Sequence, residues 1–169
     1  GNVQAFASMT NLEKRGVLYF GDHIFSDLQD PMLHLGWSTG AIVPELEREI
    51  ETQNSALFQD LIAWLQILTN LIDRHQDQAY KGGKETRHVL KLWLQERNEI
   101  RLKTKCLFNA QFGSIFRTYH NPTYFSRRLM RLADIYTSRL PNLLQYSARH
   151  TFYPRRYPLP HEAVVDVDA

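Results

Sequence analysis

The chain has 169 residues, 43% of them hydrophobic and 22% charged, a balance typical of folded globular proteins with one ordinary core. No stretch approaches the roughly twenty apolar residues that a membrane-spanning helix needs, and a single cysteine excludes an intrachain disulfide. The formal charge of +2 hides an asymmetry, because residues 1–100 carry 9 Lys and Arg against 14 Asp and Glu, whereas residues 101–169 carry 11 against 4.

The first predicted element is a short strand over residues 16–20. Its β-favouring, nearly uninterrupted apolar residues suit a parallel sheet that is covered on both faces. Gly21 lets the backbone leave the strand without a Cβ clash, which places Asp22 at the strand tip, facing the crevice where such sheets bind ligands. Asp27 then falls in the opening turn of a helix expected over about residues 26–35.

Asp22 and Asp27 together predict a magnesium site. Two carboxylates that converge on one point repel each other unless a cation or hydrogen-bond donors offset the charge. Mg²⁺ prefers oxygen ligands and usually takes one or two carboxylates together with substrate phosphate, so we expect Asp22 to bind it directly and Asp27 through a water. The alternative is an ordinary Gly-Asp turn, with Asp27 only stabilising the positive end of a helix. We expect His23 to support the turn, because magnesium disfavours imidazole.

A second strand is predicted over residues 37–43. The order strand, helix, strand is typical of a right-handed crossover unit, in which the acids follow the first strand. This order predicts an α/β fold with a parallel sheet.

The segments GDHIFSD and GWSTGAIVPELEREI resemble the fourth motif region of the haloacid dehalogenase superfamily and, more narrowly, the cytosolic purine 5′-nucleotidase family. The resemblance continues through FNAQFGSIFR, NPTYF, ADIY and LPHE, and so covers the chain from about Gly1 to Glu162. It implies part of a haloacid dehalogenase-like Rossmannoid sheet followed by a mainly helical region. It also implies a magnesium-dependent phosphatase that hydrolyses nucleoside 5′-monophosphates through an aspartyl-phosphate intermediate.

The same resemblance implies that the nucleophile lies on an Asp-x-Asp motif after an earlier strand. No such motif precedes Asp22, and Asp166-Val167-Asp168 is expected to be a solvated tail. We therefore expect the carboxyl-terminal part of a larger enzyme, supplying the Mg²⁺-binding acids and inactive alone. Ser38 stands where close relatives usually have arginine, so whatever that arginine holds is absent or replaced. The alternative is a catalytically weak or inactive relative that acts as a binding or assembly module.

An antiparallel hairpin of two long helices is predicted next. Asn54 or Ser55 is a plausible N-cap, Gly82-Gly83 a turn, and the second helix is expected over about residues 84–108. Trp64 and Trp93 are assigned to packing. Cys106, in an apolar helical stretch, is expected to be a buried thiol in a reducing compartment, which favours the cytoplasm, with a mitochondrial location as the alternative. The predicted divisions are a core over residues 1–53, the hairpin over 54–112 and a basic region over 113–169.

The basic region is expected to hold a short extended segment over residues 113–120 and a helix that opens at Asn121-Pro122, with Ile135 and Tyr136 among its apolar partners. Arg117, Arg127 and Arg128 could hold an effector phosphate or pair with a neighbouring subunit. The proline-rich stretch over residues 153–160 is expected to lie extended, and His161 to form a structural hydrogen bond. The expected partners are a nucleoside monophosphate and further copies of the chain. The scattered arginines favour an acidic protein surface over nucleic acid.

Overall fold

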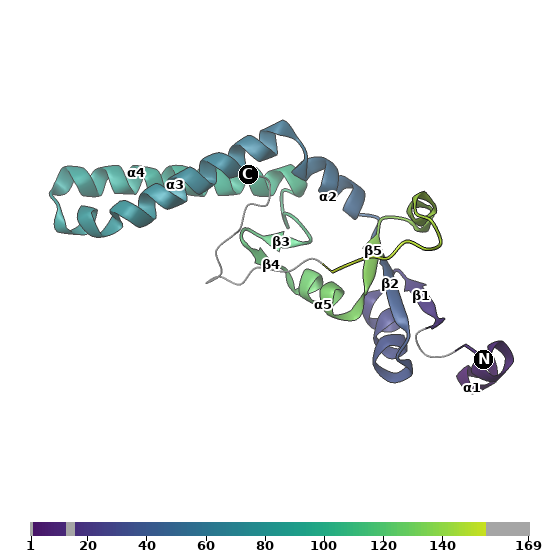
Figure 1. Ribbon diagram of the computed structural model, residues 1–169. Helices are drawn as coiled ribbons and strands as arrows, with labels where there is room; N and C mark the ends of the chain where they lie inside the picture. The colour runs from purple at the N-terminus through teal and green to yellow at the C-terminus, as the bar shows by residue number, and fades with distance from the viewer. Residues whose placement is uncertain (1, 13–15, 155–169) are drawn as a thin grey trace.

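The computed structural model describes residues 2–12 and 16–154, and it combines a small parallel sheet with long helices (Figure 1). The sheet has the order β1-β2-β5, with both pairings parallel. Phe20 pairs with Gly40, and Gly40 pairs with Ile135. The predicted α/β fold class is confirmed. The strands of this sheet are β1 Leu18–Gly21, β2 Ser38–Ile42 and β5 Ile135–Thr137.

The third strand, β5, corrects the prediction that Ile135 and Tyr136 continue the apolar face of a helix. The helix α5 (Tyr124–Leu132) ends at Ala133, and the chain then turns into β5. Thr39, wholly buried on β2, holds this turn: its backbone N–H donates to the Asp134 carboxylate at 2.9 Å, and its hydroxyl donates to the Leu132 carbonyl at 2.6 Å. Residues of the predicted third division thus join a sheet built by the first.

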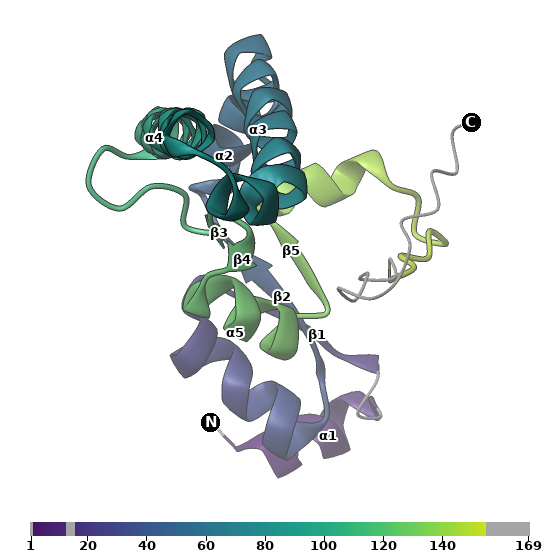
Figure 2. The ribbon, with the colours of Figure 1, turned by 90° about the vertical axis from the view of Figure 1, so that its left-hand side faces the viewer.

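The connection from β1 to β2 is helical over residues 24–35, close to the predicted 26–35. It is wound mainly as two π-helical turns, η2 (Ile24–Leu28) and η3 (Pro31–Leu35), and ends at Gly36, whose φ of 66° suits glycine. This segment lies beside α5 on one face of the sheet (Figure 2). The buried side chains of that core are Ile24, Leu28, Ala41, Val43, Leu129 and Leu132.

Aromatic side chains make further contacts within and beside the sheet. The Phe20 ring lies so close to Gly40 that a Cβ built there would be 2.2 Å from it. The helix α1 (Val3–Thr10) begins at Asn2, whose side chain accepts from the Gln4 and Ala5 N–H groups. It contacts the β1–β2 unit through Phe6, whose ring centroid lies 5.9 Å from that of Trp37.

The predicted helical hairpin is present and extends away from the sheet (Figure 1). Ser55 is the N-cap of its first helix, accepting from the Phe58 N–H at 3.3 Å. The helices bury Leu65 and Leu68 against Ile100, and Ile72 against Leu90. The helices of this region are α2 Leu46–Gln53, α3 Ala56–Lys81 and α4 Lys84–Phe108.

Two side-chain predictions for the hairpin need correction. Cys106 is exposed, because it lies on the side of α4 away from the buried Thr104 and Phe108. Trp93 packs against the hairpin core as predicted, whereas Trp64 is half exposed and donates its indole N–H to Glu96 at 2.8 Å.

The predicted helix opening at Asn121-Pro122 is also wrong. These residues form β4 (Asn121–Pro122), which pairs antiparallel with β3 (Arg117–Thr118). The helix α5 starts two residues later, with Thr123 as its N-cap. After β5 comes a 3₁₀ segment, η4 (Leu140–Gln145). The predictions for residues 155–160, His161 and Asp166-Val167-Asp168 lie outside the described residues.

Among the described helices, none is by itself both long and apolar enough to cross a membrane; only α2 and α3 taken together would pass on length and composition, and they are bent by 65° at the break between them.

Candidate functional site

The two predicted acids lie on a loop at the end of β1, which we call the acid loop (residues 21–27). Because β1, β2 and β5 run parallel, all three end at one edge of the sheet, and the acid loop lies at that edge. This is where open parallel sheets bind their ligands. Asp22 is exposed and Asp27 is half-buried.

Asp27 is held by donors from within the acid loop. One carboxylate oxygen, Oδ2, accepts from the His23 backbone N–H at 2.9 Å, and the other, Oδ1, accepts from the Ser26 hydroxyl at 2.8 Å. The His23 ring nitrogen Nδ1 accepts from the Ser26 backbone N–H at 3.1 Å, which caps the helical turn. The predicted role of His23 as support for the turn is confirmed.

These contacts lower the pKa of Asp27 below the ordinary carboxyl value. The His23 backbone N–H contributes most and the Ser26 hydroxyl next, while partial burial acts in the opposite direction. The backbone of Asp22 lowers it further, and the Asp22 carboxylate contacts that of Asp27. Asp27 is therefore anionic at neutral pH and lies beside Asp22, so the structure brings the two predicted acids together.

Gly21 is required by the side chain of Asp27 itself. A Cβ built on Gly21 would lie 2.4 Å from the Asp27 Cβ and 2.8 Å from its Oδ2. Real Cβ atoms do not approach other atoms so closely, so a larger residue would displace the acid. The expectation that Gly21 avoids a Cβ clash is confirmed, and the structure identifies the atoms involved.

Neither acid is neutralised by a basic side chain in the part of the chain that the structure describes. The ion pairs found there join His34 to Asp30 and Arg139 to Glu47. Within the same residues, no three His, Cys, Asp or Glu side chains form a cluster that could hold a metal. A cation at this edge would therefore take its protein ligands from the acid pair, a set that suits Mg²⁺, which often keeps several waters.

An aromatic stack lies against the acid loop, and sequence analysis missed it. The Phe25 and Tyr124 rings lie 6.4 Å apart and nearly parallel, and the Arg128 guanidinium lies 5.7 Å and 5.3 Å from their centroids. Arg128 Nε also donates to the Tyr124 hydroxyl at 3.1 Å. Arg128, predicted to hold a phosphate or a subunit neighbour, thus contacts rings of its own chain. No local signal could reveal a contact across about a hundred residues.

The same sheet edge carries a polar cluster beyond β2 and β5. Arg139 pairs with Glu47 at 2.9 Å, and the buried Ser138 donates to the same carboxylate at 3.1 Å. Asn142 donates to the Ser138 hydroxyl at 2.9 Å. These contacts tie α2 to the residues that follow β5, and none of the residues was singled out from the sequence.

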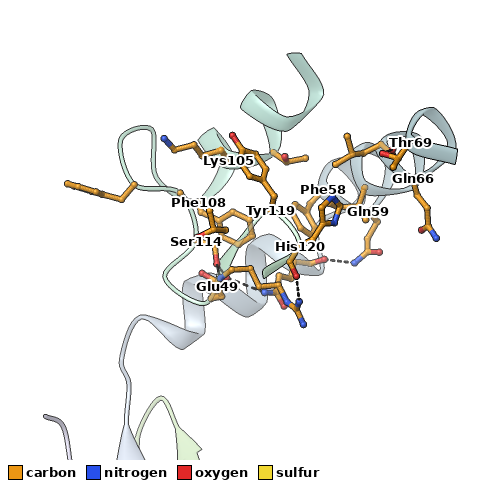
Figure 3. Close-up of a pocket in the computed structure, with 18 of the residues that line it drawn as sticks. Glu49, Phe58, Gln59, Gln66, Thr69, Lys105, Phe108, Ser114, Tyr119 and His120 are labelled. Atoms are coloured by element: carbon orange, nitrogen blue, oxygen red, sulfur yellow. Dashed lines mark hydrogen bonds between the residues drawn. The ribbon is translucent and has the colours of Figure 1, made fainter. Parts of the chain in front are cut away.

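A cavity lies away from the acids, between α3, α4 and residues 113–120 (Figure 3). It has a volume of about 700 Å³, and no acid-loop residue lines it. The buried Glu49 carboxylate in its wall accepts hydrogen bonds from Ser114 and Gln53. The acids thus occupy an open edge of the sheet, separate from this cavity.

The sequence matches the family model described as the 5′ nucleotidase family over residues 1–164. The chain belongs to the 5′-nucleotidase family.

Similar proteins carry the same family name. The chain is 55% identical over 168 residues to 5′-nucleotidase domain-containing protein 2 of Rattus norvegicus, covering 99% of the chain and 30% of that protein. It is 54% identical over 168 residues to the Homo sapiens protein of the same name, covering 99% and 32%. A 5′-nucleotidase domain-containing protein of Dictyostelium discoideum is 41% identical over 162 residues, covering 96% and 27%. The chain spans about a third of the length of these relatives.

Proposed function

We propose that this chain supplies the metal-binding acids of a Mg²⁺-dependent 5′-nucleotidase-type phosphohydrolase, which converts nucleoside 5′-monophosphates into nucleoside and phosphate. The observation that carries the proposal is the pair Asp22 and Asp27, placed side by side at the carboxyl edge of a parallel sheet in a 5′-nucleotidase family chain. The motif's resemblance to the haloacid dehalogenase superfamily supports the same reading.

The chemistry of the donors fits Mg²⁺. In the proposal the exposed Asp22 carboxylate binds the ion directly, and Asp27, kept anionic by His23 and Ser26, orients a water of its hydration shell. When bound, the ion would neutralise charge on the phosphate and so assist its transfer. The protein's part is positioning: Gly21 leaves room for Asp27, and the His23 ring fixes the turn that presents both acids.

We propose that the nucleophilic aspartate of the aspartyl-phosphate mechanism comes from outside this chain, on a strand beside β1. β1 is an edge strand of the described sheet, and its Leu18 and Tyr19 are 47% and 39% exposed. Parallel sheets usually have more strands and both faces covered, and a strand added at this edge would end next to Asp22. The chain alone is then expected to be inactive.

The test is Asp22→Asn in the full-length protein. We expect Mg²⁺-dependent release of phosphate from nucleoside 5′-monophosphates to fall by roughly a hundredfold or more, since a lost metal ligand removes several kcal/mol of charge stabilisation. Asp30→Asn is the matched control, because Asp30 is an exposed acid on the same helical segment and its carboxylate pairs with the exposed His34. Undiminished hydrolysis by the Asp22 variant would exclude the proposed metal site.

A second candidate function is that of a catalytically weak relative that works as an assembly module. The hairpin favours it, because α3 and α4 extend from the sheet and expose apolar side chains such as Leu57, Leu92 and Leu102. If the full-length protein hydrolyses none of the common nucleoside 5′-monophosphates with Mg²⁺ present, this second function is favoured over the first.

A further inference from the structure

One side of α3 carries a stripe of apolar residues that no other segment covers within residues 2–12 and 16–154. Leu57, Trp64 and Ile67 are 57%, 44% and 47% exposed. Leu71, half-buried, continues the row. The spacing of seven residues from Leu57 to Trp64 and to Leu71, with Ile67 between, is that of a coiled-coil seam. We call this row, with Asp60 and Arg74, the α3 stripe.

The α3 stripe is distinct from the two sides of the helix that already have a role. Leu65, Leu68 and Ile72 are buried against α4 and form the seam of the hairpin. Phe58 and Ile62 line the cavity beside residues 113–120. The α3 stripe occupies the remaining side.

Trp64 is anchored within the α3 stripe. Its indole N–H donates to Glu96 of α4 at 2.8 Å, while the ring stays half exposed. Leu92 and Val89, one and two turns from Glu96 on the same side of α4, are 50% and 43% exposed and widen the apolar surface. A fixed aromatic ring surrounded by smaller apolar groups is the arrangement that dominates binding energy at protein interfaces.

The charges of the α3 stripe are arranged antisymmetrically about its centre. Asp60 lies seven residues before Ile67, and Arg74 lies seven residues after it. Both side chains are exposed, and neither takes part in an ion pair with another described residue. Each lies about 10 Å along the helix axis from Ile67, at a rise of about 1.5 Å per residue.

This order of charges selects one partner and one orientation. If a second α3 runs antiparallel with its Ile67 opposite the first, Asp60 of each copy faces Arg74 of the other, twice over. In a parallel alignment Asp60 would face Asp60 and Arg74 would face Arg74, which is repulsive. A surface that complements itself under a two-fold rotation is what a symmetric dimer requires.

We propose that the α3 stripe binds the α3 stripe of a second copy of this chain, antiparallel and with the two-fold axis at Ile67. The apolar residues Leu57, Trp64 and Leu71 flank that axis and are buried by association. The Asp60–Arg74 pairs lie beyond Trp64 and Leu71 on either side of the axis and set the register of the two helices.

The first test is the mass of the full chain in solution, measured by analytical ultracentrifugation over about 0.1–100 µM. We expect a dimer. Ile67→Asp puts two like charges on the two-fold axis and is expected to weaken dimerisation by about a hundredfold or more. Ile62→Asp is the matched control: Ile62 is 37% exposed on the cavity side of the same helix and should leave the dimer unchanged. Far-ultraviolet circular dichroism checks that both variants keep their helices.

The second test reverses the charges. Asp60→Arg and Arg74→Asp alone each replace two attractive contacts by two repulsive ones and should each raise the dimer Kd about tenfold. The double variant restores both contacts and should return Kd to within about threefold of the original value. Rescue occurs only in the antiparallel register, so it also tests the orientation.

Several results would overturn the proposal. The unaltered chain could be monomeric at the highest concentration, with Trp64 protected from a soluble quencher, which would mean that another segment of the same chain covers the α3 stripe. The dimer could survive Ile67→Asp, which would place its interface elsewhere. The charge-reversed double variant could stay as weak as the single ones, which would exclude the register.

Discussion

The acid loop and the helical hairpin achieve order by different means. The acid loop holds its functional groups with hydrogen bonds between residues at most four positions apart, from Ser26 and His23 to Asp27, and buries little. Within each helix of the hairpin the backbone forms the usual hydrogen bonds between residues four positions apart, but the two helices are held together by rows of side chains such as Leu68 and Ile100, which meet from α3 and α4. A site at a sheet edge can therefore be exact in geometry without a large core, whereas the hairpin depends on burial for its stability.

If this contrast is correct, a single added methyl group in the acid loop should strongly reduce activity. In Gly21→Ala the new Cβ would lie 2.4 Å from that of Asp27, so the acid must move. We expect Mg²⁺-dependent hydrolysis by the full-length protein to fall about a hundredfold, because small displacements of catalytic groups cost that much. The measurement is phosphate release.

Gly16→Ala is the control for that experiment, since among the described residues a Cβ there would meet only Leu12, at an ordinary 3.5 Å. It should keep nearly full activity. Equal losses in the two variants would show that the β1 backbone, and not the contact between Gly21 and Asp27, limits the reaction.

The hairpin should respond to lost volume. Leu68→Ala empties a site that is 1% exposed and should lower the free energy of unfolding by about 2–4 kcal/mol in urea titrations followed by circular dichroism. Leu57→Ala removes the same atoms from an exposed position and should cost much less. A clear loss of Mg²⁺ affinity in the Leu68 variant would contradict this contrast, because it would show that the geometry of the acid loop depends on packing in the hairpin.

The smallest expected effect is the pH dependence of Asp27. Its pKa is lower in the folded state, so its charge stabilises the fold above the ordinary carboxyl pKa, and this contribution is lost as the pH falls through the lowered value. Asp27→Asn should therefore lower the unfolding midpoint slightly at pH 7, and the difference should vanish in strong acid. A difference that grows on acidification would contradict the lowered pKa.

Sequence reasoning succeeded where the determining contacts are local or periodic. The acid loop was found because Gly21, Asp22 and Asp27 lie within seven residues, and the hairpin because its apolar positions repeat with the helical period. That the acids ligate magnesium stays a prediction.

Sequence reasoning failed where the contact that determines the structure joins residues far apart in the chain. β5 has three residues and no periodicity of its own; it is a strand because it pairs with β2, next to the turn that Thr39 holds through Asp134 and Leu132. Cys106 lies in an apolar stretch, but only the position of α3 decides which side of α4 is covered.

The Thr39–Asp134 contact has an architectural consequence. It joins β2 to the residue just before β5, 95 positions later in the chain, and the arm of α3 and α4 is inserted between these neighbouring strands; the chain leaves the sheet at the carboxyl end of β2 and rejoins it at the amino end of β5. Such an insertion can lengthen, shorten or diverge in sequence while the strands keep their register. Changes in the arm and changes at the acid edge can then be selected independently.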